Sequence, residues 1–209
     1  MIIAVDGPAA SGKGTIAKAL ARHYNLPHLD TGLLYRAVAL TVRRLELDAE
    51  KEADAVAACG FDELTLADPA LRTDEIGQLA SVVSAHPLVR AALLQRQKRF
   101  AHQDGGAVLD GRDIGTVIAP DATAKLFVKA TPQVRAQRRH AELRSHGSSV
   151  SFDRVLADIR ARDARDSGRS AAPLVQAADA VTLDTSFLSI EASVQKAIAI
   201  VEDARRLSR

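Results

Sequence analysis

The sequence is poor in cysteine and in aromatic residues. Its 209 residues include one cysteine, one methionine and no tryptophan, and aromatic residues make up 3% of the chain. The single Cys59 excludes an internal disulfide framework and indicates a protein of the reducing cytoplasm. Because large aromatic side chains are scarce, alanine, leucine and valine must fill the core, which favours helices packed closely on a sheet.

Long apolar runs and a strong net charge are absent as well. No stretch approaches the roughly 20 apolar residues of a membrane span, and the apolar residues 1–5 lead directly into a glycine-rich loop, unlike a signal peptide. The net charge of +2 is too small for a general nucleic-acid binder. The six histidines show no metal-ligand spacing. We expect no membrane or nucleic-acid partner and, by default, a monomer.

The first stretch of the chain predicts a phosphate-binding loop. Ile2 to Val5 form a short apolar strand, a loop of small residues follows, and a helical pattern begins after Lys13. This is the order of a P-loop, in which backbone N–H groups and a helix N-terminus bind phosphate. Lys13 would reach the β- and γ-phosphates, and the Thr15 hydroxyl would bind Mg²⁺. The predicted ATP-binding residues are Gly7, Pro8, Ala9, Ala10, Ser11, Gly12, Lys13, Gly14 and Thr15.

One position departs from the strict P-loop pattern. Gly14 follows the lysine, and the hydroxyl residue Thr15 comes one step later than the strict motif requires. The alternative is a plain glycine turn between an ordinary strand and an ordinary helix. The buried strand before the loop and the helix after it favour the P-loop.

Strands alternate with helices along the rest of the chain. Strands are predicted at Ile2–Val5, His28–Asp30, Ala107–Asp110, Lys125–Lys129 and Ala180–Leu183, with another short one around Leu64–Leu66. Helices are predicted at Thr15–Tyr24, Leu33–Leu45, Ala49–Ala58, Asp74–Ala85, Pro87–Phe100, Ser151–Gly168 and Ser189–Arg206, and from an N-cap at Thr131 to about His146. This pattern predicts a single α/β domain over residues 1–209, with a parallel sheet of about five strands covered by helices on both faces.

Aspartates follow three of the predicted strands. Asp6, Asp30 and Asp110 stand where these strands end. Because the carboxyl ends of parallel strands meet at one edge of a sheet, we expect the three side chains to converge beside the P-loop.

Two further segments carry polar groups next to strand ends. The segment 29–36 opens a helix with Thr31 and Gly32 and brings Tyr35 and Arg36 into its first turns. An N-cap threonine, a packed tyrosine and a solvated arginine would explain it equally well. The segment 110–113 reads Asp-Gly-Arg-Asp, for which a local surface ion pair is the alternative. Their positions beside a P-loop favour an acceptor site in which Arg36 binds a second phosphate.

Arginines are concentrated in the last third of the chain. Arg154, Asp158, Arg162 and Asp166 follow one another at intervals of four residues, as in an exposed, salt-bridged helix. That explanation leaves an excess of arginines at Arg135, Arg138, Arg139, Arg165 and Arg169. A cleft that holds two polyanions needs planar multidentate donors, so we interpret the segment from about 144 to 170 as an arginine-rich lid.

The chain resembles bacterial cytidylate kinases over nearly its whole length. The resemblance rests on motifs in the same order, at Gly7–Thr15, Leu29–Arg36, Asp110–Val117 and Arg162–Asp166. It accounts for the Lys-Gly-Thr ending, which nucleoside monophosphate kinases share. It implies a P-loop kinase fold that transfers the γ-phosphoryl group of ATP to CMP or dCMP, with Mg²⁺ as cofactor.

The resemblance also implies roles for individual residues. Lys13, Arg36 and Arg162 would be catalytic. Ser81, Arg90 and Asp113 would contact cytosine, whose amino group suits a carboxylate acceptor where uracil presents a carbonyl. The implied CMP-binding residues are Thr31, Tyr35, Arg36, Ser81, Arg90, Arg112, Asp113, Arg162, Asp166 and Arg169.

The helical acceptor-binding region, from about 31 to 103, departs from the longer members of that family. They carry a small antiparallel sheet where this chain has residues 47–72. The dozen or so residues at 61–72 would hold a hairpin stub at most.

Two other functions stay open at this point. A P-loop kinase for another small acceptor, such as an alcohol, would use Asp30 or Asp110 as a base, but has little use for the arginines at 162–169. A nucleotide-dependent switch or nucleic-acid ATPase would use an arginine-rich helix face, but the chain lacks aromatic residues for stacking.

Overall fold

A parallel sheet lies at the centre of the molecule. The computed structural model describes residues 1–145 and 147–207, and within them the sheet has five strands in the order β2-β3-β1-β4-β5. The strands are β1 (Ile2–Asp6), β2 (His28–Asp30), β3 (Ala107–Gly111), β4 (Ala124–Lys129) and β5 (Val181–Asp184). All neighbours pair in parallel, which confirms the predicted α/β class and P-loop kinase fold. The loop after the central β1 lies at the point where the strand order reverses, where such sheets bind ligands.

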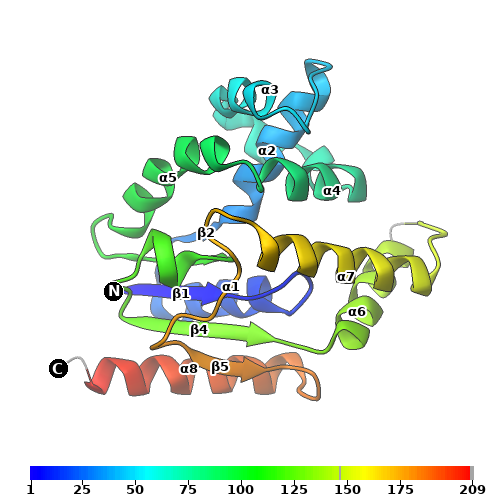
Figure 1. Ribbon diagram of the computed structural model, residues 1–209. Coiled ribbons are helices and arrows are strands. Elements are labelled where there is room, and N and C mark those ends of the chain that lie inside the picture. Colours follow the sequence, from blue (N-terminus) through cyan, green and yellow to red (C-terminus); the bar gives the residue numbers. More distant parts are fainter. Residues whose placement is uncertain (146, 208–209) are drawn as a thin grey trace.

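The helices cover both faces of this sheet and extend beyond it (Figure 1). They are α1 (Lys13–Tyr24), α2 (Thr31–Arg44), α3 (Glu52–Ala57), α4 (Asp74–Val83), α5 (Pro87–Ala101), α6 (Pro132–Ser145), α7 (Phe152–Gly168) and α8 (Ile190–Leu207). Side chains alternate along β1, as a strand requires. Ile3 and Val5 pack under α1 and α8 on one face. Ala4 packs on the other face against α5 and the π-helix Ile114–Ile118.

Side-chain caps define where several helices begin. The Asp30 carboxylate accepts a hydrogen bond from the Gly32 N–H at 2.9 Å, so α2 starts at Thr31 and Asp30 is its N-cap. The Thr131 hydroxyl accepts from the Val134 N–H at 3.4 Å, as predicted for the N-cap of α6. The predicted end of α6 at His146 lies outside the described residues, and the described helix ends at Ser145.

The segment 58–72 contains no strand among its described residues, so the prediction of a strand at Leu64–Leu66 is wrong. It forms three short 3₁₀-helices instead, at Ala58–Gly60, Glu63–Ala67 and Pro69–Arg72. The carboxylates of Asp62 and Asp68 each accept from the backbone N–H two residues later, at 2.8 Å. These local bonds favour tight helical turns over an extended chain, so no hairpin stub forms here.

Helices α2 to α5 lie together towards the β2 edge of the sheet and extend beyond it (Figure 1). Their shared core is built from α2 residues such as Leu34 and Val38 together with Val83 of α4 and Leu93 of α5. Helices α6 and α7 pack on each other through a smaller core that contains Ala136, Val155 and Ile159. The latter pair contains most of the predicted lid.

Within the described part of the chain, no helix is both long and apolar enough to cross a membrane.

The side chain of Asp6 has a structural role in the fold. Its buried carboxylate accepts hydrogen bonds from the N–H groups of Ile114 and Gly115, at 2.9 and 2.8 Å. It therefore holds the start of the π-helix to the end of β1. Of the three aspartates expected to converge beside the P-loop, Asp6 has both carboxylate oxygens bonded to the backbone.

The titration of Asp6 should appear in the pH dependence of stability. Burial raises its pKa from 3.8 to about 6, against the opposing effect of the two backbone hydrogen bonds. Folding thus disfavours the ionised form, and its contribution to the free energy of unfolding should fall as the pH rises from about 4 to about 6. Relative to Asp6→Asn, which does not titrate, the wild-type protein should lose about 2 kcal/mol over this range.

Urea unfolding of both proteins at the two ends of this pH range measures the effect. A stability difference between wild type and Asp6→Asn that does not change with pH would contradict the assignment.

Candidate active site

The loop after β1 passes so close to β4 that one of its positions must be glycine. A Cβ atom on Gly7 would lie 2.0 Å from the Val128 carbonyl oxygen, and the φ angle of this residue is +153°. Gly12 has a φ of +92° just before α1 begins at Lys13. The loop therefore presents its backbone N–H groups and the N-terminus of α1, as a phosphate-binding loop requires.

Lys13 lies at the floor of a large cleft. The cleft has a volume of about 660 Å³ and is bordered by the P-loop, α2, α4 and the α6–α7 pair. The Nζ atom of Lys13 is 3.8 Å from Oδ2 of the buried Asp110. Burial, and then repulsion by Arg112, lowers the pKa of Lys13 to about 8, although Asp110 and Asp30 oppose the shift. Among the predicted site residues, this cleft is lined by Ala9, Ala10, Lys13, Arg36, Ser81, Arg112 and Arg162.

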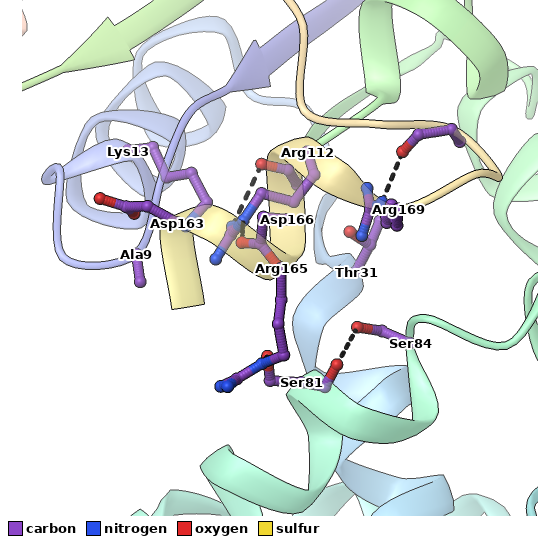
Figure 2. A network of polar contacts seen from close by, with 12 residues as sticks. Ala9, Lys13, Thr31, Ser81, Ser84, Arg112, Asp163, Arg165, Asp166 and Arg169 are labelled. Atoms are coloured by element: carbon purple, nitrogen blue, oxygen red, sulfur yellow. Dashed lines mark hydrogen bonds and ion pairs between the residues drawn. The ribbon is translucent and has the colours of Figure 1, made fainter. Parts of the chain in front are cut away.

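A smaller pocket, called the inner pocket below, adjoins this cleft and shares Arg112 and Arg162 with it. The predicted residues that line it are Thr31, Tyr35, Arg90, Arg112, Asp113, Arg162, Asp166 and Arg169. The two cavities together bring all ten predicted CMP-binding residues into one region, although the chain separates the first from the last by more than a hundred residues. Figure 2 shows several of them, with Asp166 of α7, in yellow, beside Arg112, and Arg169 directly after that helix near Thr31.

The inner pocket contains a buried ion pair. Arg90 bonds to the Asp113 carboxylate and also donates to the Ser84 carbonyl at 3.3 Å. Its guanidinium lies 5.5 Å from the centre of the Tyr35 ring. The pocket therefore offers a donor and an acceptor side by side against an aromatic ring, which suits the polar edge of a planar heterocycle.

Arg112 and Asp166 form a second ion pair at the pocket wall. The Arg112 Nε donates to Asp166 Oδ2 at 2.7 Å (Figure 2). Burial alone would raise the pKa of Asp166, but Arg112 outweighs it and holds this pKa below its usual value. Asp166 therefore stays ionised, with its other carboxylate oxygen available to accept a hydrogen bond.

Arg162 forms no ion pair among the described residues, although the charge of Asp166 opposes the lowering of its pKa. Its Nε atom is shielded from solvent and makes no hydrogen bond. Burial and the neighbouring Arg112 lower its pKa to about 10, which still leaves it charged at neutral pH. Arg169 also has one unbonded, shielded nitrogen, Nη2, while its Nε donates to the Ala172 carbonyl at 2.6 Å. Two guanidinium groups at one pocket, each with a shielded nitrogen that makes no hydrogen bond, point to an anionic ligand.

Among the described residues, Arg36 and Arg165 donate hydrogen bonds only to uncharged groups. Arg36 donates to the Leu71 carbonyl at 2.6 Å and lies against Gly77, where a Cβ atom would come within 3.0 Å of its guanidinium. The Arg165 Nε donates to the Ser81 hydroxyl at 3.1 Å. Both side chains are thus held at the cleft by partners that an anion can replace.

Thr15 is exposed in the first turn of α1 and lines neither cavity. The other two strand-end aspartates also have local partners. Asp30 caps α2, and Asp110 bonds to His28 and faces Lys13. In the described part of the chain no three His, Cys, Asp or Glu side chains form a metal-binding group.

Comparison with known proteins agrees with this geometry. The family described as cytidylate kinase matches residues 3–203. The chain belongs to the cytidylate kinase family. The curated cytidylate kinase of Xanthobacter autotrophicus is 62% identical over 209 residues, which are all of both chains. That of Azorhizobium caulinodans is 60% identical over 206 residues, which are 98% of this chain and 100% of the relative.

Solved structures of more distant proteins share the fold. An uncharacterized protein from Eubacterium ventriosum superposes with a TM-score of 0.55 at 19% identity, covering 97% of this chain and 98% of its own. A sugar kinase from Janibacter sp. superposes with a TM-score of 0.51 at 15% identity, covering 99% and 96%. At such identities the likeness extends to the fold alone.

Three residues outside the predicted site hold the P-loop of this cytidylate kinase family member. Arg135 is buried, pairs with Asp163 through two bonds of 2.9 and 2.6 Å, and donates to the Ala9 carbonyl at 3.2 Å. Arg138 and Thr185 both donate to the Ser11 carbonyl, at 3.3 and 2.9 Å.

Sequence reasoning counted the two arginines among those of a lid or cleft rim and missed Thr185. Arg135 and Arg138 lie in α6, which follows β4, and Thr185 comes directly after β5. These positions at the P-loop end of the sheet are the signal that was available.

Removal of the unpaired Arg162 should stabilise the ligand-free protein. Arg162→Met removes a charge that burial penalises and keeps much of the packing, so we expect the free energy of unfolding to rise by about 1 kcal/mol. The same change should abolish the stabilisation that a bound phosphate compound confers on the wild type. Thermal unfolding with and without CMP measures both effects.

Arg160→Met is the matched control, because Arg160 lies on the same helix and is exposed. It should change neither the stability nor the response to CMP. Destabilisation by Arg162→Met with an unchanged response to CMP would contradict the role given to Arg162.

Proposed function

We propose that the protein transfers the γ-phosphoryl group of ATP to CMP and to dCMP, giving CDP and dCDP. The observation that carries the proposal is the shielded Arg162, which forms no ion pair among the described residues and stands between Lys13 at the P-loop and the inner pocket. A cation placed between two cavities suits a reaction in which two phosphate groups meet. The curated relatives are named cytidylate kinases, which agrees with this assignment.

The P-loop would hold the triphosphate and the inner pocket the monophosphate. Lys13 would bind the β- and γ-phosphates beside the N–H groups of the loop. Arg36 and Arg162 would bind the acceptor phosphate and the transferring group, with Thr31 and Tyr35 lining the same side of the pocket. The Asp166 carboxylate, held by Arg112, would accept a ribose hydroxyl, and Arg169 would donate beside it.

The chemistry needs alignment and charge stabilisation more than proton transfer. A phosphate oxygen of CMP attacks the γ-phosphorus, the bond from that phosphorus to the β,γ-bridging oxygen breaks, and ADP leaves. With a second pKa near 6, the CMP phosphate is largely deprotonated at neutral pH, so no general base is required. The cations around the cleft would then stabilise the negative charge that develops on the transferring phosphoryl group.

Mg²⁺ would be held mainly by the nucleotide. The described residues offer no cage of three acidic or histidine ligands, which suits an ion that keeps water and phosphate oxygens around it. The exposed Thr15 hydroxyl is an oxygen ligand of the kind that Mg²⁺ accepts. When bound, the ion would neutralise charge on the phosphates.

The inner pocket supports cytosine as the base. Asp113 can accept from the exocyclic amino group of cytosine, and Arg90 can donate to its ring nitrogen and carbonyl. Ser81 lines the larger cleft and is held by Arg165, so it would approach the base from the opposite side of Arg90 and Asp113. Uracil would place a carbonyl against the Asp113 carboxylate, which leaves two acceptors without a donor.

The proposal includes the regional organisation and the location of the protein. Residues of about 31–103 would close on CMP, and the arginine-rich segment of about 144–170 would act as the lid within one domain. The short 3₁₀-helices at 58–72 would shape the entrance in place of an inserted sheet. We assign the protein to the cytoplasm, as a monomer, with ATP and CMP or dCMP as its partners.

Of the alternatives, transfer to a small alcohol lacks a free base. Asp30 is engaged as the N-cap of α2, and Asp110 bonds to His28 and faces Lys13. A carboxylate held in this way is poorly placed to take a proton from a hydroxyl group.

A coupled assay with ATP and a panel of acceptors separates the possible functions. CMP, dCMP, UMP, AMP and shikimate are offered separately, and ATP hydrolysis is followed with added DNA or RNA. We expect strong turnover with CMP and dCMP and weak turnover with the others. Hydrolysis that nucleic acid stimulates, without use of any acceptor, would overturn the proposal.

Asp113→Asn tests the choice of base. The substitution replaces an acceptor by a group that can also donate, so the ratio of kcat/KM for CMP to that for UMP should fall by about tenfold. A circular dichroism spectrum checks that the inner pocket still folds around Arg90. If the ratio stays at its wild-type value, cytosine is recognised elsewhere.

A further inference from the structure

His28 lies at the start of β2, outside both cavities of the site. Its side chain reaches the site through the carboxylate of Asp110. Its Nε2 atom is 2.8 Å from Oδ1 of Asp110. The side chain of Asp110 is almost completely buried, with 2% of it exposed. Asp110 belongs to β3, which pairs directly with β2, so the contact crosses between neighbouring strands.

The two carboxylate oxygens of Asp110 have different neighbours. Oδ1 bonds to His28, while Oδ2 lies 3.8 Å from the Nζ atom of Lys13. This is the one ion pair that Lys13 makes within the described residues.

The backbone at Asp110 is held independently of its side chain. The Asp110 carbonyl accepts a hydrogen bond from the Thr31 hydroxyl at 2.9 Å, and its strand pairs on both sides. The remaining freedom of the side chain is rotation about its Cα–Cβ and Cβ–Cγ bonds. The bond to His28 removes this rotation and keeps Oδ2 directed at Lys13.

Lys13 needs such a partner more than an arginine would. A lysine has a long flexible stem and a single charged atom, so its position is set by what it binds. Transfer of a phosphoryl group depends on that position within a fraction of an ångström.

We propose that His28 is a positioning residue for phosphoryl transfer, which fixes the Asp110 carboxylate that in turn places the Lys13 ammonium group. The inference rests on the proposed function, in which Lys13 binds the transferring phosphate.

The surroundings of His28 allow substitution without disturbing the sheet. On the side away from Asp110, His28 borders an open surface cavity of about 480 Å³ together with Lys18, Arg22 and Leu26. Side chains of similar size therefore fit at this position.

His28→Leu and His28→Gln form the decisive pair of variants. Leucine fills similar space without a donor, whereas the glutamine amide can still donate to Asp110 at a similar reach. We expect His28→Leu to lower kcat on the order of tenfold while the KM for CMP changes by less than about twofold. His28→Gln should return kcat to within about threefold of the wild type.

His102→Leu is the matched control, because it removes another contact between a histidine and an aspartate, 3.1 Å long and far from the cleft. Its kcat should equal that of the wild type. Thermal unfolding of all variants measures folding separately from catalysis. Equal kcat in His28→Leu and wild type, or equal losses in the Leu and Gln variants, would overturn the role of His28.

A double-mutant cycle tests the route through Asp110. In an Asp110→Asn background, His28→Leu should change kcat by less than about twofold, because an amide does not attract the Lys13 charge. A full additional loss in that background would overturn the proposal. The wild-type rate with CMP reports on the proposed function, and the ratio of variant to wild type reports on His28, so the two failures are distinguishable.

Discussion

Buried positive charge at the cleft is the constraint on which the rest of this structure depends. Lys13 and Arg162 are placed where burial disfavours their charged forms and lowers their pKa values to about 8 and about 10, although nearby aspartates oppose both shifts. Such charges destabilise the ligand-free protein, and an anion that binds between them compensates this cost. The rest of the fold must therefore supply enough stability to hold these cations in place before any ligand arrives.

Two kinds of arginine contact meet this requirement. Arg112 and Arg135 bind aspartates at 2.7 and 2.6 Å, and they hold α7 against the inner pocket and against the P-loop. Arg36 and Arg165 bind a carbonyl and a hydroxyl, which are weaker partners for a cation. The first kind builds the site, and the second kind remains available for phosphate.

The sheet sets the positions from which these residues act. Because β1 lies between β3 and β4, the P-loop, Asp110 and the helices that follow all start from the same edge. Aspartates at strand ends then serve the scaffold: Asp6 holds the π-helix, Asp30 caps α2, and Asp110 links His28 to Lys13. Each carboxylate satisfies neighbours that would otherwise be buried without a partner.

The sequence by itself determined the class of fold, the P-loop and the identities of the residues that gather in the cleft. Apolar runs, glycine spacing and caps such as Thr131 act over a few residues, so they can be read from the chain. The strand predicted around Leu64–Leu66 was wrong, because the carboxylates of Asp62 and Asp68 bond to the nearby backbone and outweigh strand propensity.

Only the tertiary structure decided which charges are paired. In the folded chain Arg135 pairs with Asp163, whereas Arg162 forms no ion pair among the described residues. His28 bonds to Asp110 across two neighbouring strands. Those pairings depend on the approach of segments far apart in the chain, which no local pattern encodes.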